Sequence, residues 1–264
     1  MIKLVVTDID GTLLPEGTDR MPPELYEIVR ELKERGILFA GASGRQYASM
    51  MHVFEPIAQD MIFIAENGSN VMCRGRNMAT DRIAPQLARE VVAYIRTKKE
   101  CYQALSTPEV MYIEAEDSDY LSLMRDGYHN KIEVVPDLMP YCESTNKLCL
   151  YCGQGVEHLA EEVQEKFGKR LNVMISGSIW IDFMNPWADK GAALATIQKL
   201  MHIKREETMA FGDNFNDMGM LKNAGESYAM ENAHPKLKEA AKYIAPPVEE
   251  QGVLQVIRER LLAP

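Results

Sequence analysis

The sequence has little of what several classes of catalytic site require. It contains five histidines in 264 residues, and none of them lies in the loops that follow the expected buried strands. This absence argues against zinc-dependent hydrolysis and against a Ser-His-Asp triad. Its five cysteines are an odd number in a long chain, which does not suggest a disulfide framework.

Two of these cysteines, Cys149 and Cys152, have the spacing of a redox or zinc motif, and Cys142 lies nearby. However, residues 147–152 are predicted to form a strand, and side chains three apart on a strand point to opposite faces. That geometry is poor for chelation. We therefore interpret these cysteines as small buried apolar residues.

The chain also lacks an excess of basic charge and any long apolar run. A net charge of -10 argues against nucleic acid or an anionic membrane as the main partner, because both attract basic surfaces. No apolar run approaches the length that crosses a bilayer. Lys3 and a core strand follow Met1 almost at once, so we expect no signal peptide and a cytoplasmic protein, either a monomer or a homodimer.

Four short apolar runs are predicted to be buried strands of a parallel sheet. Between the first two runs, Leu25, Ile28, Val29 and Leu32 form the apolar stripe of a helix that ends near Gly36. Strand, helix and strand then make a βαβ unit, whose strands end at the same edge. The four runs are Leu4–Val6, Ile37–Ala42, Met61–Ala65 and Thr208–Phe211.

The pattern changes near Asp81. From about Arg82 to Phe183, apolar and polar residues alternate along several segments, which is typical of a sheet with one covered face. We therefore predict an α/β protein with a parallel-sheet core, residues 1–81 and 184–264, and an inserted α+β domain, residues 82–183. Two final edge strands are expected at Tyr228–Met230 and Tyr243–Ala245.

Polar residues follow each predicted core strand directly, and acids dominate them. Three or more carboxylates at one sheet edge repel each other unless a cation lies among them. A few oxygen ligands suit Mg²⁺, whose coordination is completed by water and by a substrate phosphate. These residues are Asp8, Asp10, Ser43, Asn67, Asp213, Asn216 and Asp217, with Lys190 at a helix N-terminus. Asn67 is equally well explained as a turn residue.

This set of residues suits phosphoryl transfer. A carboxylate such as Asp8 can attack phosphorus and form an aspartyl phosphate. Asp10, two residues on, is placed to protonate the departing oxygen and later to deprotonate water. Lys190 and the Ser43 hydroxyl would hold the phosphoryl oxygens, and backbone N–H groups of the Ile9–Gly11 turn would add donors.

Four ordered motifs in this set resemble those of the haloacid dehalogenase (HAD) superfamily. They are Asp8-Ile9-Asp10-Gly11-Thr12, Ser43-Gly44-Arg45, Asp189-Lys190-Gly191 and Gly212-Asp213-Asn214-Phe215-Asn216-Asp217. The insertion between the second and third motifs is similar to the large α/β cap, type C2B, of the Cof-type phosphatases. The resemblance covers the whole chain. It implies a Rossmann-like core, an inserted cap domain and Mg²⁺-dependent phosphatase activity.

The resemblance also implies a role for each motif residue. Asp8 is the nucleophile and Asp10 the general acid/base. The metal ligands are the side chains of Asp8 and Asp213 and the backbone carbonyl of Asp10. Asp217 holds Lys190 or a metal-bound water. The phosphate contacts are Ile9, Ser43, Gly44, Lys190 and Asn216.

Asp10 favours a phosphatase over a dehalogenase within this superfamily, because an alkoxide leaving group needs a proton and a halide does not. Two features depart from the Cof-type pattern. Ser43 stands where threonine is usual, which keeps the hydroxyl. The segment Pro246–Val253 lacks the usual Thr, Asn and Asp, so we expect changed local hydrogen bonding there.

Some alternatives stay open at this point. A phosphomutase acting on sugar phosphates, or less plausibly a non-catalytic phospho-ligand-binding protein, fits the same motifs. Sugar phosphates lead as the substrate class, ahead of nucleotides and vitamin phosphates. Arg45 is either a substrate contact or part of a salt bridge across the hinge of the inserted domain. Four residues of uncertain role are either pocket-lining residues or ordinary core and surface: Lys147, Trp180, Asp182 and Trp187.

Overall fold

The computed structural model describes residues 1–18 and 20–263, which form two compact units. Unit 1 comprises Met1–Arg45, Met50–Ala79 and Asp189–Pro264, and unit 2 comprises Gln46–Ser49 and Thr80–Ala188. The predicted insertion, residues 82–183, lies within the range of unit 2. Its role as a separate cap domain stays a prediction.

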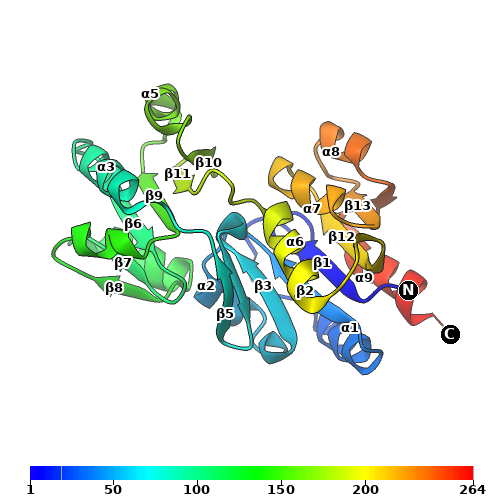
Figure 1. The fold of residues 1–264 in the computed structure, drawn as a ribbon. Helices are drawn as coiled ribbons and strands as arrows, with labels where there is room; N and C mark the ends of the chain where they lie inside the picture. The colour runs from blue at the N-terminus through cyan, green and yellow to red at the C-terminus, as the bar shows by residue number, and fades with distance from the viewer. Residues whose placement is uncertain (19, 264) are drawn as a thin grey trace. The chain divides into compact units, whose positions relative to one another are not determined.

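Unit 1 is built on an eight-stranded sheet in the order β14-β13-β12-β1-β2-β3-β4-β5 (Figure 1). The pairs from β14 to β3 are parallel, and β4 runs antiparallel to β3. This confirms the predicted α/β class with a parallel-sheet core. The strands are β1 Leu4–Asp8, β2 Leu38–Ala42, β3 Met61–Ala65, β4 Asn70–Cys73, β5 Arg76–Thr80, β12 Thr208–Gly212, β13 Glu226–Met230 and β14 Tyr243–Ala245.

Strand β1 lies at the centre of this sheet, between β12 and β2. In the strand register Thr7 is level with both Phe211 and Gly41, and Asp8 is level with Ala42. All five residues of β1 are buried, as a strand covered on both faces requires. Parallel pairing therefore brings the loops that follow β1, β2, β3 and β12 to one edge of the sheet, where ligands bind in such folds.

Helix α1 shows how local sequence fixes an element of this unit. Two prolines, Pro22 and Pro23, begin it, and its apolar stripe is buried. It ends before Gly36, which has a φ of 76° and so suits the left-handed end of a helix. The α-helices of unit 1 are α1 Pro23–Glu34, α2 Tyr47–Val53, α6 Lys190–Met201, α7 Met218–Lys222, α8 Pro235–Ala240 and α9 Gly252–Ile257. Helix α2 begins among the residues assigned to unit 2.

The helices of unit 1 pack in two groups. Helix α1 contacts α9 and the C-terminal turn Arg258–Leu262, whereas α6 contacts α7. The right-handed crossovers β1–α1–β2 and β12–α7–β13 step in opposite directions along the sheet, which places α1 and α7 on opposite faces (Figure 1). Among the described residues, no helix is both long enough and apolar enough to cross a membrane.

Two details of the sheet differ from the sequence-based expectation. Strand β13 is internal, because it pairs with both β12 and β14, so only β14 is an edge strand on that side. Strand β5, at the other edge, was not predicted. Its sequence, Arg-Asn-Met-Ala-Thr, is half-buried to exposed and has no apolar run to reveal it.

Unit 2 contains a six-stranded sheet in the order β10-β11-β9-β6-β7-β8, antiparallel except for the β7–β8 pair. Its strands are β6 Cys101–Ser106, β7 Met111–Ile113, β8 Ile132–Val134, β9 Lys147–Cys152, β10 Asn172–Ile175 and β11 Trp180–Met184. Its helices are α3 Pro85–Ile95, α4 Ser118–Ser122 and α5 Glu157–Phe167.

The alternation predicted one covered face, but both faces of this sheet carry a cluster of buried residues. The larger core includes Leu150 and Cys152 of β9 together with residues of α3 and α5. The smaller one includes Tyr120 of α4, against which Tyr151 and Trp180 pack. All five cysteines are free thiols, and Cys152 of β9 is level with Cys101 of the adjacent strand β6. Cys142, Cys149 and Cys152 are buried, as expected of small apolar residues.

Candidate active site

Asp8 and Lys190 form a buried ion pair at the end of β1. The Asp8 side chain is about 8% exposed, and one of its carboxylate oxygens accepts a hydrogen bond from the Lys190 ammonium. Lys190 is completely buried and is the first residue of α6. The preceding residue, Asp189, caps this helix by accepting a hydrogen bond from the backbone N–H of Ala192 at 2.8 Å. The helix start therefore holds the lysine against the strand end.

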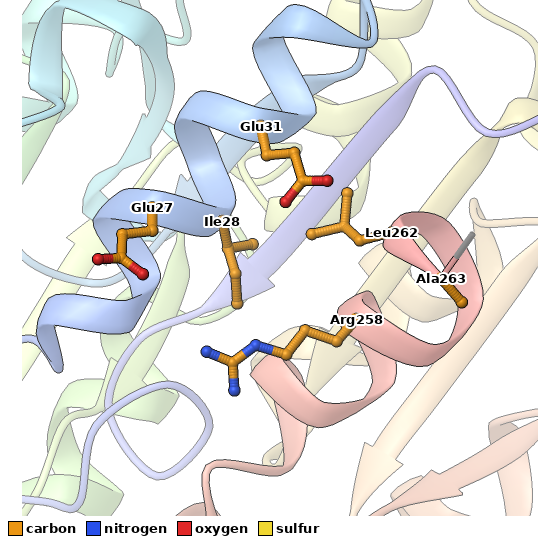
Figure 2. Close-up of a pocket in the computed structure, with 6 residues that line it drawn as sticks. All are labelled: Glu27, Ile28, Glu31, Arg258, Leu262 and Ala263. Atoms are coloured by element: carbon orange, nitrogen blue, oxygen red, sulfur yellow. The ribbon is translucent and has the colours of Figure 1, made fainter.

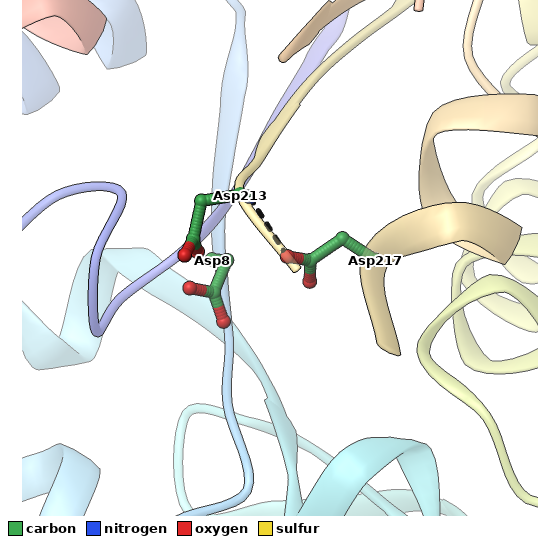
Figure 3. Close-up of side chains that lie close together, drawn as sticks. All are labelled: Asp8, Asp213 and Asp217. Atoms are coloured by element: carbon green, nitrogen blue, oxygen red, sulfur yellow. Dashed lines mark hydrogen bonds between the residues drawn. The ribbon is translucent and has the colours of Figure 1, made fainter. Parts of the chain in front are cut away.

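Asp217 is a second acid that contacts the Lys190 ammonium. Its Oδ1 accepts a hydrogen bond from Lys190 at 2.7 Å. Its Oδ2 accepts from the backbone N–H groups of Asp213 and Asn214 at 3.0 and 3.1 Å, the first of which is drawn in Figure 3. Both carboxylate oxygens of Asp217 thus have partners, so this residue is best placed to hold Lys190 and the loop after β12.

Close backbone approaches make this arrangement possible. A Cβ atom on Gly191 would lie 2.4 Å from the carbonyl carbon of Gly219, so α6 and α7 can pack together only because both residues lack side chains. Gly191 follows Lys190, and Gly219 lies two residues after Asp217. Paired glycines therefore bring the lysine and its acid partner within hydrogen-bonding distance.

Asp213 faces the loop that follows β1. Its Oδ1 accepts a hydrogen bond from the Thr12 hydroxyl at 2.9 Å. A Cβ atom on Gly11 would lie 2.5 Å from Oδ2 of Asp213, and Gly11 has a φ of 84°. Only glycine suits both the conformation and the space. Gly11 and Thr12 of the first motif therefore fix the position of Asp213, the acid of the fourth motif.

Asp8, Asp213 and Asp217 have carboxylate oxygens within 4.8 Å of one another (Figure 3). Burial, and then the charge of Asp217, raises the pKa of Asp8 well above its ordinary value. The same two causes raise the pKa of Asp213. Burial alone would lower the pKa of Lys190, but the charges of Asp217 and Asp8 outweigh it and raise that pKa. The cluster is thus short of positive charge even with the lysine in place.

This deficit is what a divalent cation would relieve. The available donors are carboxylate oxygens, which suit a hard cation such as Mg²⁺. Because Lys190 and backbone groups already engage Asp217, the side chains best placed to hold the ion are those of Asp8 and Asp213. The residues present therefore fit the magnesium site expected from the sequence.

Asp10 is held away from this cluster by Arg45. The guanidinium donates two hydrogen bonds to the carboxylate, from Nε to Oδ2 at 3.0 Å and from Nη2 to Oδ1 at 2.6 Å. The sequence predicts Arg45 as either a substrate contact or part of a salt bridge across a hinge, and it does not indicate Asp10 as the partner. The signal was available: Asp10 and Arg45 each follow the end of a strand, and those strands, β1 and β2, are adjacent.

The remaining predicted phosphate contacts come from neighbouring loops. Ser43 directly follows β2, and its hydroxyl accepts a hydrogen bond from the backbone N–H of Arg45 at 3.2 Å. Asn216 donates a hydrogen bond from Nδ2 to Oδ1 of Asn67 at 3.1 Å. The side chain of Ile9 is fully buried, so only its backbone is available to a ligand.

The four residues whose role the sequence left open belong to unit 2. Lys147 and Asp182 form an ion pair of 3.7 Å in unit 2, Trp180 packs on Tyr151, and the Trp187 side chain is 80% exposed. A surface pocket of about 360 Å³ lies between α1 and the C-terminal turn, and Figure 2 draws the residues that line it. Its lining contains none of the predicted site residues: Glu27, Ile28, Glu31, Arg258, Leu262 and Ala263.

Comparison with known proteins agrees with these observations. A protein-family profile described as haloacid dehalogenase-like hydrolase matches residues 5–257. The chain is 30% identical over 261 residues to the 5-amino-6-(5-phospho-D-ribitylamino)uracil phosphatase of Escherichia coli, covering 97% of this chain and 95% of the relative. It is 28% identical over 250 residues to the HMP-PP phosphatase of Klebsiella pneumoniae, covering 90% and 87%.

A solved structure gives the same result for the fold. A protein from Thermotoga maritima superposes with a TM-score of 0.86 at 28% identity, covering 98% of this chain and 97% of that protein. The family match spans nearly the whole chain and includes all four motifs described above. The chain therefore belongs to the haloacid dehalogenase-like hydrolases, and the curated relatives it resembles are phosphatases.

Proposed function

We propose that this protein is a Mg²⁺-dependent phosphatase that hydrolyses small phosphorylated metabolites through an aspartyl phosphate on Asp8. The observation that carries the proposal is the buried carboxylate of Asp8 at the end of β1, fixed by Lys190 and facing Asp213. A fixed carboxylate in a cluster that favours a cation is what in-line attack on a phosphate ester requires.

The proposed reaction has two steps. An oxygen of Asp8 attacks phosphorus while the bond from phosphorus to the ester oxygen breaks, and Asp10 gives its proton to the departing alcohol. A water molecule then loses a proton to Asp10 and attacks the aspartyl phosphate, which releases inorganic phosphate and restores the Asp8 carboxylate. Since Arg45 holds Asp10 in the free protein, the Asp10 side chain must exchange this partner for the substrate oxygen.

The other residues bind and orient the phosphoryl group. Lys190 is proposed to offset its charge together with Ser43 and backbone N–H groups of the loop after β1. Asp8 and Asp213, with the backbone carbonyl of Asp10, are proposed to hold Mg²⁺. When bound, the ion supplies charge stabilisation for the phosphoryl oxygens. Asp217 keeps Lys190 in place.

The substrate is proposed to be a small phosphate ester, with sugar phosphates tested first. Two named relatives act on 5-amino-6-(5-phospho-D-ribitylamino)uracil and on HMP-PP, so these compounds belong in the same panel. Residues 82–183 are proposed to act as the cap that selects among them. Release of inorganic phosphate from a hexose phosphate supports a hydrolase, whereas an isomeric sugar phosphate indicates the mutase alternative.

Removal of the metal is expected to lower turnover of a generic phosphomonoester by about 10²- to 10³-fold, the size of effect that loss of a few kcal/mol of charge stabilisation produces. Activity should return on addition of excess Mg²⁺. The measurement is phosphate release before chelation, after chelation and after Mg²⁺ addition. Full activity in the chelated protein, with no metal detected by elemental analysis, would contradict the metal assignment.

Replacing Asp10 by asparagine is expected to lower kcat by about 10²- to 10³-fold, because asparagine can neither protonate the alcohol nor accept a proton from water. Mg²⁺ affinity, measured by calorimetry, should change little, since the proposed ligand is the backbone carbonyl. Asp60→Asn is the matched control, because Asp60 also pairs with a basic side chain, Lys33, but lies outside the site. A large loss of Mg²⁺ affinity in Asp10→Asn would count against these roles.

A further inference from the structure

The turn Glu66–Gly68, directly after β3, has an unusual backbone. Its three residues have consecutive positive φ values of 52°, 55° and 98°. Residues other than glycine avoid this left-handed region, and Asn tolerates it better than most. Strained turns of this kind persist only where surrounding contacts fix them, and they occur often at functional sites. The contacts of this turn therefore indicate what it does.

One side of the turn contacts the loop after β2. The backbone N–H of Asn67 donates to the carbonyl of Ser43 at 2.9 Å, and the N–H of Glu66 donates to the carbonyl of Arg45 at 2.9 Å. A Cβ atom on Gly44 would lie 3.1 Å from Nδ2 of Asn67. The amide of Asn67 is thus packed against the backbone of Gly44.

The turn also touches the start of α6. A Cβ atom on Gly68 would lie 2.2 Å from the carbonyl oxygen of Asp189 and 2.8 Å from the backbone nitrogen of Lys190. The close approach is possible because residue 68 is glycine, which the φ of 98° also favours. The backbone of the turn therefore supports the residue that carries the ammonium group of the site.

The third contact is with the loop after β12. The Asn67 side chain is nearly fully buried, with 4% of its surface exposed, and its Oδ1 accepts the hydrogen bond from Nδ2 of Asn216. One short turn thus joins the Ser43–Gly44 loop, the Lys190 helix start and Asn216. These three segments contain four of the proposed phosphate contacts.

We propose that Asn67 is a positioning residue for the phosphoryl group of the substrate, acting through Asn216 and the Ser43–Gly44 loop. The inference rests on the proposed phosphatase function. Asn67 combines a side chain that tolerates the left-handed backbone with an acceptor that orients the Asn216 amide. Its Nδ2 atom limits how closely the Ser43–Gly44 backbone can approach the turn. Asn67 itself does not touch the reacting atoms.

The first test is Asn67→Gly, which removes the side chain and keeps a backbone suited to positive φ. We expect the KM for a generic phosphomonoester, and the inhibition constant of inorganic phosphate, to rise about tenfold, with kcat changed less than about threefold. His202→Gly is the matched control, because His202 has the same φ of 55° and ends α6 on the surface. If both variants change Tm by a similar amount and only Asn67→Gly raises KM and the phosphate inhibition constant, the effect comes from positioning and not from loss of folding stability.

A double-mutant cycle with Asn216→Ala tests the route of the effect. If Asn67 acts through Asn216, Asn67→Gly should weaken phosphate binding by less than about threefold when Asn216 is already alanine, because coupled residues are not additive. Fully additive effects would overturn the proposal. So would unchanged phosphate inhibition in the Asn67→Gly single variant.

Asn67→Asp supplies a variant that keeps the left-handed backbone and the acceptor oxygen. It places a negative charge against Gly44, so inorganic phosphate should bind at least about tenfold more weakly. Because residue 67 is buried, added salt should change this loss little. Unchanged affinity in this variant would also overturn the proposal. The wild-type assay separates the two levels of inference, since a wild type without phosphatase activity contradicts the proposed function itself.

Discussion

Replacement of Asp8 by asparagine is expected to lower kcat/KM by about 10⁵-fold or more, the scale seen when a catalytic nucleophile is removed. An amide cannot attack phosphorus as a carboxylate does, and the Asp8 oxygen has no substitute in the same position. Asp213 and Asp217 have carboxylate oxygens within 4.8 Å of that of Asp8, but Thr12 and Lys190 already engage them. Neither is expected to take over the attack.

The same substitution should not unfold the protein. Burial and the charge of Asp217 raise the pKa of Asp8, which means that the folded structure disfavours its ionised form. A neutral amide of the same shape removes that cost, while Lys190 keeps Asp217 as a partner. The metal-free Tm of Asp8→Asn is therefore expected to equal or exceed that of the wild type.

The decisive measurement is a single-turnover reaction followed by an acid quench. Wild type should yield phosphate covalently bound to the protein, and Asp8→Asn should yield none. Asp60→Asn serves again as the control for an acid-to-amide change outside the site. A variant at position 8 that keeps wild-type turnover, or that still forms the covalent adduct, would show that another group is the nucleophile.

The sequence predicted the central part of the fold well because buried parallel strands carry a strong local signal. The run Met61–Ala65 was predicted with the bounds that β3 has in the structure, and β1, β2 and β12 differ by a residue or two at their ends. The signal is weaker where burial is partial. Strand β5 was missed for this reason, and β13 was mistaken for an edge strand because its position depends on pairing with β14.

The candidate site was predicted as a set of residues but not as a network. Strand order brings Asp8, Ser43 and Asp213 to one edge, and this follows from the pattern alone. The pairing of Asp10 with Arg45 and the double contact of Asp217 depend on side-chain direction and loop conformation, which periodicity does not report. The sequence does not decide the role of Asn67, because an Asn-Gly pair is explained by a local turn and gives no sign of the contact with Asn216.

Replacement of Lys190 by methionine is expected to have the largest effect on stability. Lys190 is fully buried and pairs with both Asp8 and Asp217. Removing the ammonium leaves these acids buried without it, and loss of one partner from a buried ion pair costs about 3 to 5 kcal/mol. Turnover should also fall by about 10³-fold, because the positive charge near the phosphoryl oxygens is lost.

Lys147→Met is the matched control for this variant. Lys147 is also a buried lysine, but it lies in unit 2 and its ion pair with Asp182 is longer, at 3.7 Å. We therefore expect a smaller loss of stability, about 1 to 3 kcal/mol, with no dependence on Mg²⁺. Chemical denaturation of both variants, with chelator and with Mg²⁺, gives the comparison. Equal losses of stability in the two variants would show that the ion pairs of Lys190 stabilise the fold no more than the pair of Lys147 with Asp182.

The response of Lys190→Met to metal links its stability to the proposed chemistry. Without the lysine, Asp8, Asp213 and Asp217 remain close together, so a divalent cation is the charge best able to offset them. Mg²⁺ should therefore stabilise this variant more than it stabilises the wild type, by ligand linkage to the folded state. Catalysis should not return, because the ion cannot take the place of the ammonium group that pairs with both Asp8 and Asp217. Recovery of both stability and turnover would mean that Lys190 only balances charge, and that the phosphoryl group is held by other residues.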